Sequence, residues 1–148
     1  MKKIFLAFTM TILTLSLFAA CDKDDKVVGL NETPEKLQVF LNTHFNGVDV
    51  VYVEKEWNNY DVYLKNGFDL EFSKSGDLTE VDCNRNDMPQ SIIDLLPAKV
   101  MEYVNANHKD RSIESINFRS NGYKVELKGE PDIEMYFDKD GNFKRNDY

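Results

Sequence analysis

The strongest constraint on the fold of this 148-residue chain is an internal repeat. Residues 33–81 and 96–146 look like two copies of one unit, because three blocks of similar sequence recur in the same order. The matching blocks are Pro34–Leu37 with Pro97–Val100, Tyr60–Lys65 with Tyr123–Lys128 and, after a short insertion, Phe72–Leu78 with Phe137–Phe143. Self-similarity of this kind indicates that one supersecondary unit occurs twice.

Each copy begins with a predicted helix. In the first copy Thr33 is a suitable N-cap, Pro34 suits the first helical position, and apolar residues recur at helical spacing from Leu37 to Phe45. The second copy repeats this pattern from Pro97.

The rest of each copy is predicted to form four short antiparallel strands. Asn121-Gly122 is a strong signal for a two-residue hairpin turn, and the turns ending in Gly67, Gly76 and Gly141 suit three-residue loops. Combined with the apolar alternation, these turns predict inward pairs. The expected pairs are Ile116 with Leu127, Phe118 with Val125, Trp57 with Tyr60, Val62 with Leu70, Leu64 with Phe68, Phe72 with Leu78, and Phe137 with Phe143. Lys55 would then lie inward opposite Val62, which the pattern does not explain.

The sequence therefore predicts an α+β fold. Two tandem helix-plus-four-strand repeats would form one antiparallel sheet within a single domain, residues 33–148. Because the strands alternate between apolar and polar residues, we expect the helices to cover one face of the sheet and the other face to be exposed.

The N-terminal residues predict export and anchoring. Residues 1–20 have the layout of a signal peptide, since two lysines precede an apolar stretch that ends in Ala19-Ala20. Leu17–Cys21 resembles the bacterial lipobox, and Asp22–Asp25 looks like a surface-export signal of certain Gram-negative lipoproteins. We expect lipid attachment at Cys21 and a flexible acidic tether over residues 21–32. The chain would be an outer membrane lipoprotein, surface-exposed or periplasmic-facing, of a Gram-negative bacterium.

The charge balance limits the partners. The chain has 26 Asp and Glu against 18 Lys and Arg, a net charge of −8, and no basic run. Nucleic-acid binding depends on cations that meet phosphates, so the sequence argues against it.

The duplicated unit resembles a known family. Its Tyr-x-Val-x-Leu strand, at Tyr60–Leu64 and Tyr123–Leu127, and the hairpin Phe137–Phe143 are similar to the PepSY-like, β-lactamase-inhibitor-protein-like family of secreted bacterial proteins. The resemblance covers residues 33–146 and implies an eight-stranded sheet backed by helices. In the named inhibitor the exposed sheet face clasps a target protein, but fold-level likeness does not transfer that target to this chain.

No catalytic, metal or cofactor motif emerges from the sequence. His44 and His108 are expected at helix ends, and Cys83, next to Asp82, lacks the electropositive setting of a reactive thiol. The loop at residues 138–142 has carboxylates as a calcium loop does, yet the equivalent loop at 73–77 lacks two of them, so a hairpin explains both.

The outward-facing side chains are the candidate partner face. In the predicted register Glu56, Asp61 and Glu71 form one acidic row, and the equivalent row of the second copy holds Arg119, Lys124 and Tyr136. The complete set is Tyr52, Glu54, Glu56, Asp61, Tyr63, Lys65, Asp69, Glu71, Arg119, Lys124 and Tyr136. Adjacent like charges destabilise a sheet unless solvent screens them or a partner uses them, and tyrosines suit a docking surface.

Two functional hypotheses follow, beside the plain alternative of a solvated, aggregation-resistant face. The first is a lipid-anchored, non-enzymatic binding or inhibitor-like module that contacts an unidentified protein or peptide. The second is a lipoprotein that binds or senses a cation or a small polar ligand at Glu56, Asp61 and Glu71.

Overall fold

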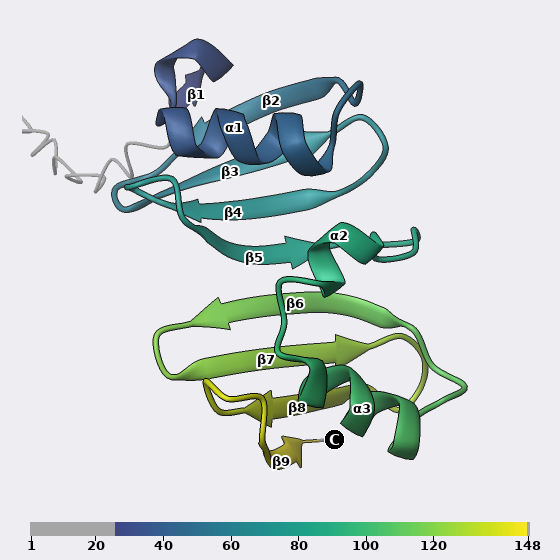
Figure 1. Ribbon diagram of the computed structural model, residues 1–148. Coiled ribbons are helices and arrows are strands. Elements are labelled where there is room, and N and C mark those ends of the chain that lie inside the picture. Colours follow the sequence, from purple (N-terminus) through teal and green to yellow (C-terminus); the bar gives the residue numbers. More distant parts are fainter. Residues whose placement is uncertain (1–25, 148) are drawn as a thin grey trace, which may run out of the picture.

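The computed structural model describes residues 26–147, and the fold is given for this part of the chain. Its strands form one antiparallel sheet in which each strand lies beside its neighbours in sequence (Figure 1). The strands are β1 (Lys26–Val28), β2 (Val50–Lys55), β3 (Asn59–Leu64), β4 (Asp69–Ser73), β5 (Leu78–Asp82), β6 (Ile113–Arg119), β7 (Gly122–Leu127), β8 (Ile133–Phe137) and β9 (Phe143–Asp147). The helices are the 3₁₀ helix η1 (Leu30–Glu32) and the α-helices α1 (Glu35–His44), α2 (Gln90–Ile93) and α3 (Ala98–Asn107).

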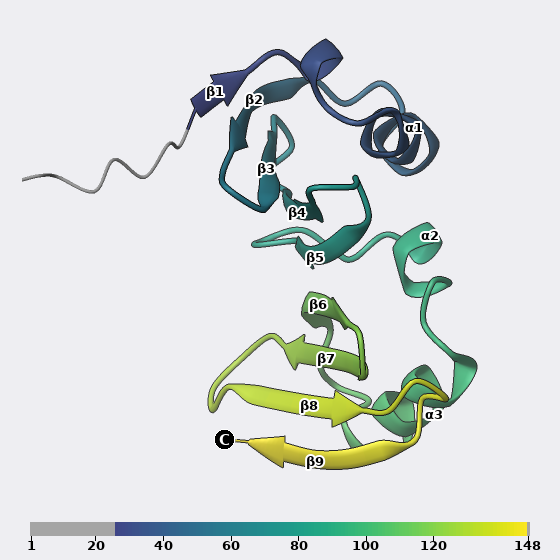
Figure 2. The ribbon, with the colours of Figure 1, turned by 90° about the vertical axis from the view of Figure 1, so that its left-hand side faces the viewer.

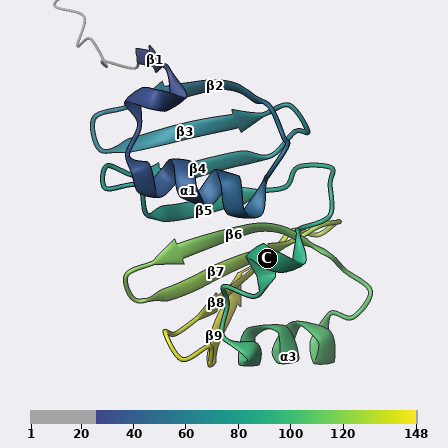
Figure 3. The same ribbon diagram turned by 45° about the horizontal axis from the view of Figure 1, so that its top comes forward.

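The α-helices lie on one side of the sheet. Figure 2 shows α1, α2 and α3 together on that side, while the edge strands β1 and β9 curve toward the opposite side. Figure 3 shows α1 over the strands of the first repeat and α3 beside those of the second. We call the side of the sheet opposite the helices the open face. The predicted α+β fold, with its tandem repeats and one exposed face, is confirmed.

One hydrophobic core fills the space between sheet and helices. Leu37 and Leu41 of α1 are buried there, and Val100 and Val104 of α3 take the same places in the second copy. The strands add alternate side chains that are almost fully buried: Val53, Val62, Leu70, Phe72, Val81, Ile116, Val125, Leu127 and Met135. Because this alternation continues across both copies, the side chains that alternate with these core positions lie on the open face, apart from the residues at β-bulges.

The turns with a third-position glycine give the predicted registers. Val62 pairs with Leu70, Phe72 with Leu78, and Phe137 with Phe143. The backbone N–H of Leu64 donates to the carbonyl of Phe68 at 2.9 Å. These predictions are confirmed.

The first hairpin of each copy is shifted by two residues from its predicted register. Val53, not Lys55, lies opposite Val62, and Lys55 pairs with Tyr60. The loop is longer than expected and is closed by the Glu56 N–H, which donates to the carbonyl of Asn59 at 3.0 Å. Trp57 is consequently not an inward partner of Tyr60, since its side chain is 82% exposed.

In the second copy the two-residue turn is Ser120-Asn121, so Phe118 pairs with Tyr123 and Ile116 with Val125. Gly122 belongs to β7 and not to the turn. Its φ is 145°, and a Cβ there would lie 1.9 Å from the carbonyl oxygen of Phe137, so only glycine fits. A shift of two residues leaves the side chains within the paired strands on their predicted faces, which is why these face assignments survive the register error. Trp57, which lies in the loop, is the exception.

The N-terminal part differs from the expected tether. Residues 26–32 form β1 and η1 because Val28 and Leu30 pack against the core and β1 pairs with β2. The sheet therefore has nine strands in the described residues, one more than predicted. The predicted signal peptide, Cys21 and the first part of the tether lie outside the described residues. No helix within residues 26–147 has the length and apolar character to cross a bilayer.

Candidate functional site

Two rows of side chains cross the open face from β2 to β9, set by the register of successive strands. The first row consists of Glu54, Asp61, Glu71, Glu80, Asn117, Lys124, Tyr136 and Arg145. The second consists of Tyr52, Tyr63, Asp69, Asp82, Ser115, Glu126, Glu134 and Asp147. Neighbouring members lie within side-chain reach, because directly paired residues have Cβ atoms about 5 Å apart.

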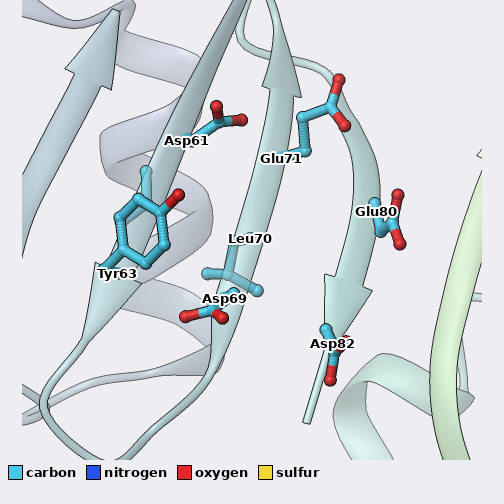
Figure 4. A pocket seen from close by; sticks show the side chains of 8 residues that line it. Asp61, Tyr63, Asp69, Leu70, Glu71, Glu80 and Asp82 are labelled. Atoms are coloured by element: carbon cyan, nitrogen blue, oxygen red, sulfur yellow. The ribbon is translucent and has the colours of Figure 1, made fainter. Parts of the chain in front are cut away.

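The β2–β5 end of the first row is acidic. We call Glu54, Asp61, Glu71 and Glu80 the acidic row; Figure 4 shows Asp61, Glu71 and Glu80 on three neighbouring strands. Partial burial, together with the carboxylates of Glu56 and Glu71, raises the pKa of Asp61 from 3.8 to about 6. Burial also raises the pKa of Glu80, and the nearby side chain of Asn117 offsets this only in part. The row therefore holds negative charge at neutral pH at a cost in folding free energy.

A shallow cavity of about 190 Å³ lies beside this row. It is lined by Asp61, Val62, Tyr63, Asp69, Leu70, Glu71, Glu80 and Asp82 (Figure 4). A second cavity of about 270 Å³, at the junction of the two repeats, is lined by Asp82, Glu114, Glu126, Leu127, Asp132, Ile133 and Glu134. Both are therefore predominantly acidic.

An aromatic stack lies next to the acidic row. The rings of Tyr52 and Tyr63 are stacked, with centroids 4.3 Å apart and an interplanar angle of 23°, and Tyr52 is 38% exposed. Burial and the neighbouring Tyr52 raise the pKa of Tyr63 to about 12, so its hydroxyl stays protonated and can donate. Lys65, another member of the predicted partner face, does not lie opposite Tyr52 and forms an ion pair with Asp49 at 3.0 Å.

The second copy balances its charges. Lys124 is flanked on the open face by Glu126 and Glu134, with its Nζ 3.3 Å from the Glu134 carboxylate. Partial burial lowers the pKa of Lys124, but the hydrogen bonds that its ammonium group donates to these two carboxylates outweigh burial and raise the pKa overall. The guanidinium groups of Arg119 and Arg145 lie 5.5 Å and 4.3 Å from the centroid of the Tyr136 ring.

Every residue of the predicted partner face belongs to the open-face side of its strand or to a strand end. The predicted row partners Asp61 and Glu71 are directly paired, as are Lys124 and Tyr136. The register shift places Glu54 rather than Glu56 opposite Asp61, although Glu56 remains close enough to raise the pKa of Asp61. In the same way Asn117, not Arg119, lies opposite Lys124.

The sequence interpretation missed Glu80, Asp82, Ser115 and Arg145. Alternation in Leu78–Asp82 was a usable signal for the first two, because Val81 faces the core and its neighbours must face away. Their position beside β6 had no local signal, since α2 and α3 separate β5 from β6 in sequence.

The described residues contain no group of side chains arranged as a metal site. Within residues 26–147 no three His, Cys, Asp or Glu side chains are grouped so that they could hold a metal ion. His44 ends α1 and stacks on Phe40 at 4.4 Å, and His108 caps α3, as expected. Cys83 is fully buried, and burial raises the pKa of its thiol. Asp138 accepts hydrogen bonds from Asn142, which confirms its loop as a hairpin.

The comparisons with known proteins agree with the repeat and the fold. The family model described as "Putative beta-lactamase-inhibitor-like, PepSY-like" matches the chain twice, over residues 21–79 and 58–145. No curated protein matches the chain.

Three solved structures resemble the protein over most of its length. One is a "putative calcium-regulated periplasmic protein" of Bacteroides thetaiotaomicron, with 31% identity, a TM-score of 0.75, and coverage of 84% of this chain and 98% of that one. A "putative periplasmic protein of unknown function" from Bacteroides vulgatus has 28% identity, a TM-score of 0.74, and coverage of 84% and 99%. A "putative periplasmic protein" of the DUF2874 family from the same species has 32% identity, a TM-score of 0.72, and coverage of 87% and 100%. These descriptions are consistent with an extracytoplasmic location.

Proposed function

This chain belongs to the beta-lactamase-inhibitor-like, PepSY-like family, and from that premise we propose that it is a non-enzymatic binding module that contacts a protein or peptide through its open face. Its similarity to described periplasmic proteins supports a role outside the cytoplasm. The predicted signal peptide and the lipobox-like Leu17–Cys21 support anchoring through a lipid on Cys21, at the outer membrane of a Gram-negative cell.

One observation carries the proposal: the two rows of aromatic and charged side chains continue across both repeats on a curved face that the helices leave uncovered (Figure 2). A curved sheet presents many side chains to one partner at the same time. Tyr52, Tyr63 and Tyr136 offer rigid rings with polar tips, which contribute contact area at low entropic cost. The charged side chains around them would set the partner's orientation.

The test is crosslinking in intact cells. A photoreactive amino acid at position 63 reports on the open face, and the same probe at position 39 is the control, because Val39 lies on α1 and is 57% exposed. The proposal expects a discrete crosslinked protein from position 63 that position 39 does not give. Equal products from both positions, or none from position 63, would overturn it.

Substitution at the two ends of the face adds a quantitative test. We expect Tyr63→Ala and Tyr136→Ala to retain the far-UV circular dichroism spectrum, since neither residue belongs to the core cluster. Each should weaken capture of the crosslinked partner by about tenfold, the effect of losing an interface anchor worth roughly 1.4 kcal/mol. Undiminished capture by both variants would argue against the open face.

Cation binding is the second candidate. It is favoured by the raised pKa of Asp61 and by the relative described as calcium-regulated. It ranks second because, among residues 26–147, no three carboxylates converge on one point, whereas calcium takes six to eight oxygen ligands. Thermal unfolding with and without calcium decides it, since a ligand at 100 times its dissociation constant adds about 2.7 kcal/mol of stability. An unchanged melting temperature would remove this candidate.

A further inference from the structure

We propose that the partner of the open face presents lysine or arginine side chains, carried on an extended segment, to the acidic row and the adjoining Tyr52–Tyr63 stack. This inference rests on the proposed function and specifies the chemistry of the partner.

The first observation is uncompensated charge. Glu54, Asp61, Glu71 and Glu80 are consecutive register partners on four strands. Among residues 26–147, no ion pair joins a lysine or arginine to any of these four side chains. Asp61 accepts only a neutral hydrogen bond, from the Nδ2 of Asn59 at 3.2 Å. A cationic group is therefore what this row lacks.

The second observation is independent of the carboxylates. Ser115 is 2% exposed, and its Oγ has no hydrogen-bond partner among the described residues. By register it lies on the open face beside Asp82, a residue that lines both acidic cavities. A buried hydroxyl without a partner is costly, so a ligand N–H group that displaces the side chains covering Ser115 would gain a hydrogen bond there.

A second copy of this chain is a poor occupant. The cations of its own open face already have contacts, because Lys124 pairs with Glu126 and Glu134, and Arg145 pairs with Asp147. Arg119 lies over the ring of Tyr136. Two copies would also bring together chains that each carry a net charge of −8. The complementary charge must come from a different molecule.

The spacing of the row favours an extended segment over a point ion. Neighbouring strands lie about 4.8 Å apart, so the row from β2 to β5 is about 14 Å long. Side chains from several residues of one segment can meet that length, whereas a single ion cannot. The Tyr52–Tyr63 stack adds a ring face beside the row, and the chain already places Arg145 over Tyr136 and Lys74 over Trp57 in this manner.

The experiment measures by isothermal titration calorimetry the affinity of the processed chain, residues 21–148, for a short end-blocked peptide of alternating arginine and alanine. The test variant is Asp61→Asn/Glu71→Gln/Glu80→Gln. The control variant, Glu35→Gln/Glu102→Gln/Asp110→Asn, removes the same charge from exposed positions elsewhere. A peptide of alternating glutamate and alanine controls for nonspecific binding.

We expect the arginine peptide to bind the parent protein, the control variant to bind within about twofold of it, and the test variant to bind about tenfold more weakly or not at all. Absence of binding to the parent, or equal losses in both variants, would overturn the inference. Circular dichroism establishes that each variant is folded. If position 63 gives a crosslinked partner but the arginine peptide does not bind, the inference of a cationic partner is refuted and the proposed function stands. If position 63 gives no crosslinked partner, both the inference and the proposed function are refuted.

Discussion

Asp61 gives the sharpest quantitative test of the open face. Its carboxylate lies among Glu54 and Glu56, from β2 and the following turn, and Glu71 of β4, with only Asn59 as a donor. Replacement by asparagine keeps an acceptor for Asn59 and removes the charge. We therefore expect Asp61→Asn to stabilise the folded protein at neutral pH.

The magnitude follows from the pKa of Asp61, which rises from 3.8 to about 6 on folding. A difference of about two in pKa corresponds to roughly 3 kcal/mol between the two protonation states. Asp61 is only partly buried, so solvent screening reduces this to about 1 kcal/mol. In a domain of this size such a gain raises the melting temperature by about 3–5 °C.

The sign of the pH dependence is fixed by the same pKa values. Between about pH 4 and pH 6 the folded protein binds more protons at Asp61 than the unfolded chain does, so Asp61 makes stability fall as the pH rises through this window. The penalty is complete above about pH 6 and absent below about pH 4. The advantage of Asp61→Asn should therefore be present at pH 7.5 and nearly vanish at pH 3.5.

Urea unfolding, followed by circular dichroism at both pH values, measures this difference. Asp138→Asn is the opposite control, because hydrogen bonds from Asn142 hold the pKa of Asp138 at about 2 and its loss should destabilise the protein at pH 7.5. A destabilised Asp61→Asn variant at pH 7.5, or a gain that is equal at both pH values, would refute the reasoning.

Three further predictions concern the fold. Gly122→Ala should lower the free energy of unfolding by at least about 3 kcal/mol or prevent folding, because the new Cβ would lie 1.9 Å from the carbonyl oxygen of Phe137. Gly47→Ala is the control, since it has open space around it and should cost about 1 kcal/mol. Chemical unfolding of both variants measures the difference. Cys83 is fully buried and should react with a thiol reagent only in denaturant, so fast labelling of the native protein would contradict its position. Trp57, the single tryptophan, is 82% exposed, and its fluorescence should be quenched by iodide nearly as efficiently as that of free tryptophan. Strong protection from iodide would instead support the predicted inward pairing of Trp57 with Tyr60.

Local turn chemistry explains which parts of the open face could be predicted. The pairs Asp61–Glu71 and Tyr63–Asp69 depend on the loop that ends in Gly67, whose φ is 91° as a bulged turn requires. The turn before β3 has no glycine to set its length, and Gly122 belongs to β7 and not to the turn before it, so the predicted register was wrong by two residues in both places. Charge on the face could thus be predicted, but the partner of Glu54 could not.

Non-local pairing was beyond the sequence. β5 pairs with β6 across α2 and α3, so the place of Glu80 and Asp82 beside Asn117 and Ser115 depends on how the two repeats join. That junction is set by the common core, through residues such as Val81 and Ile116, and not by any turn.

The two copies provide an internal comparison that bears on function. The repeat alignment makes Asn117, Lys124 and Tyr136 the equivalents of Glu54, Asp61 and Glu71, and these equivalents occupy the same row on the same face. The second copy places one cation between two acids and so offsets part of their negative charge. The same backbone could hold a lysine at position 61, yet the first copy holds a third carboxylate whose pKa is raised by its neighbours. Since folding alone gains nothing from that choice, the acidic row is better explained by the cation it would meet than by the sheet that carries it.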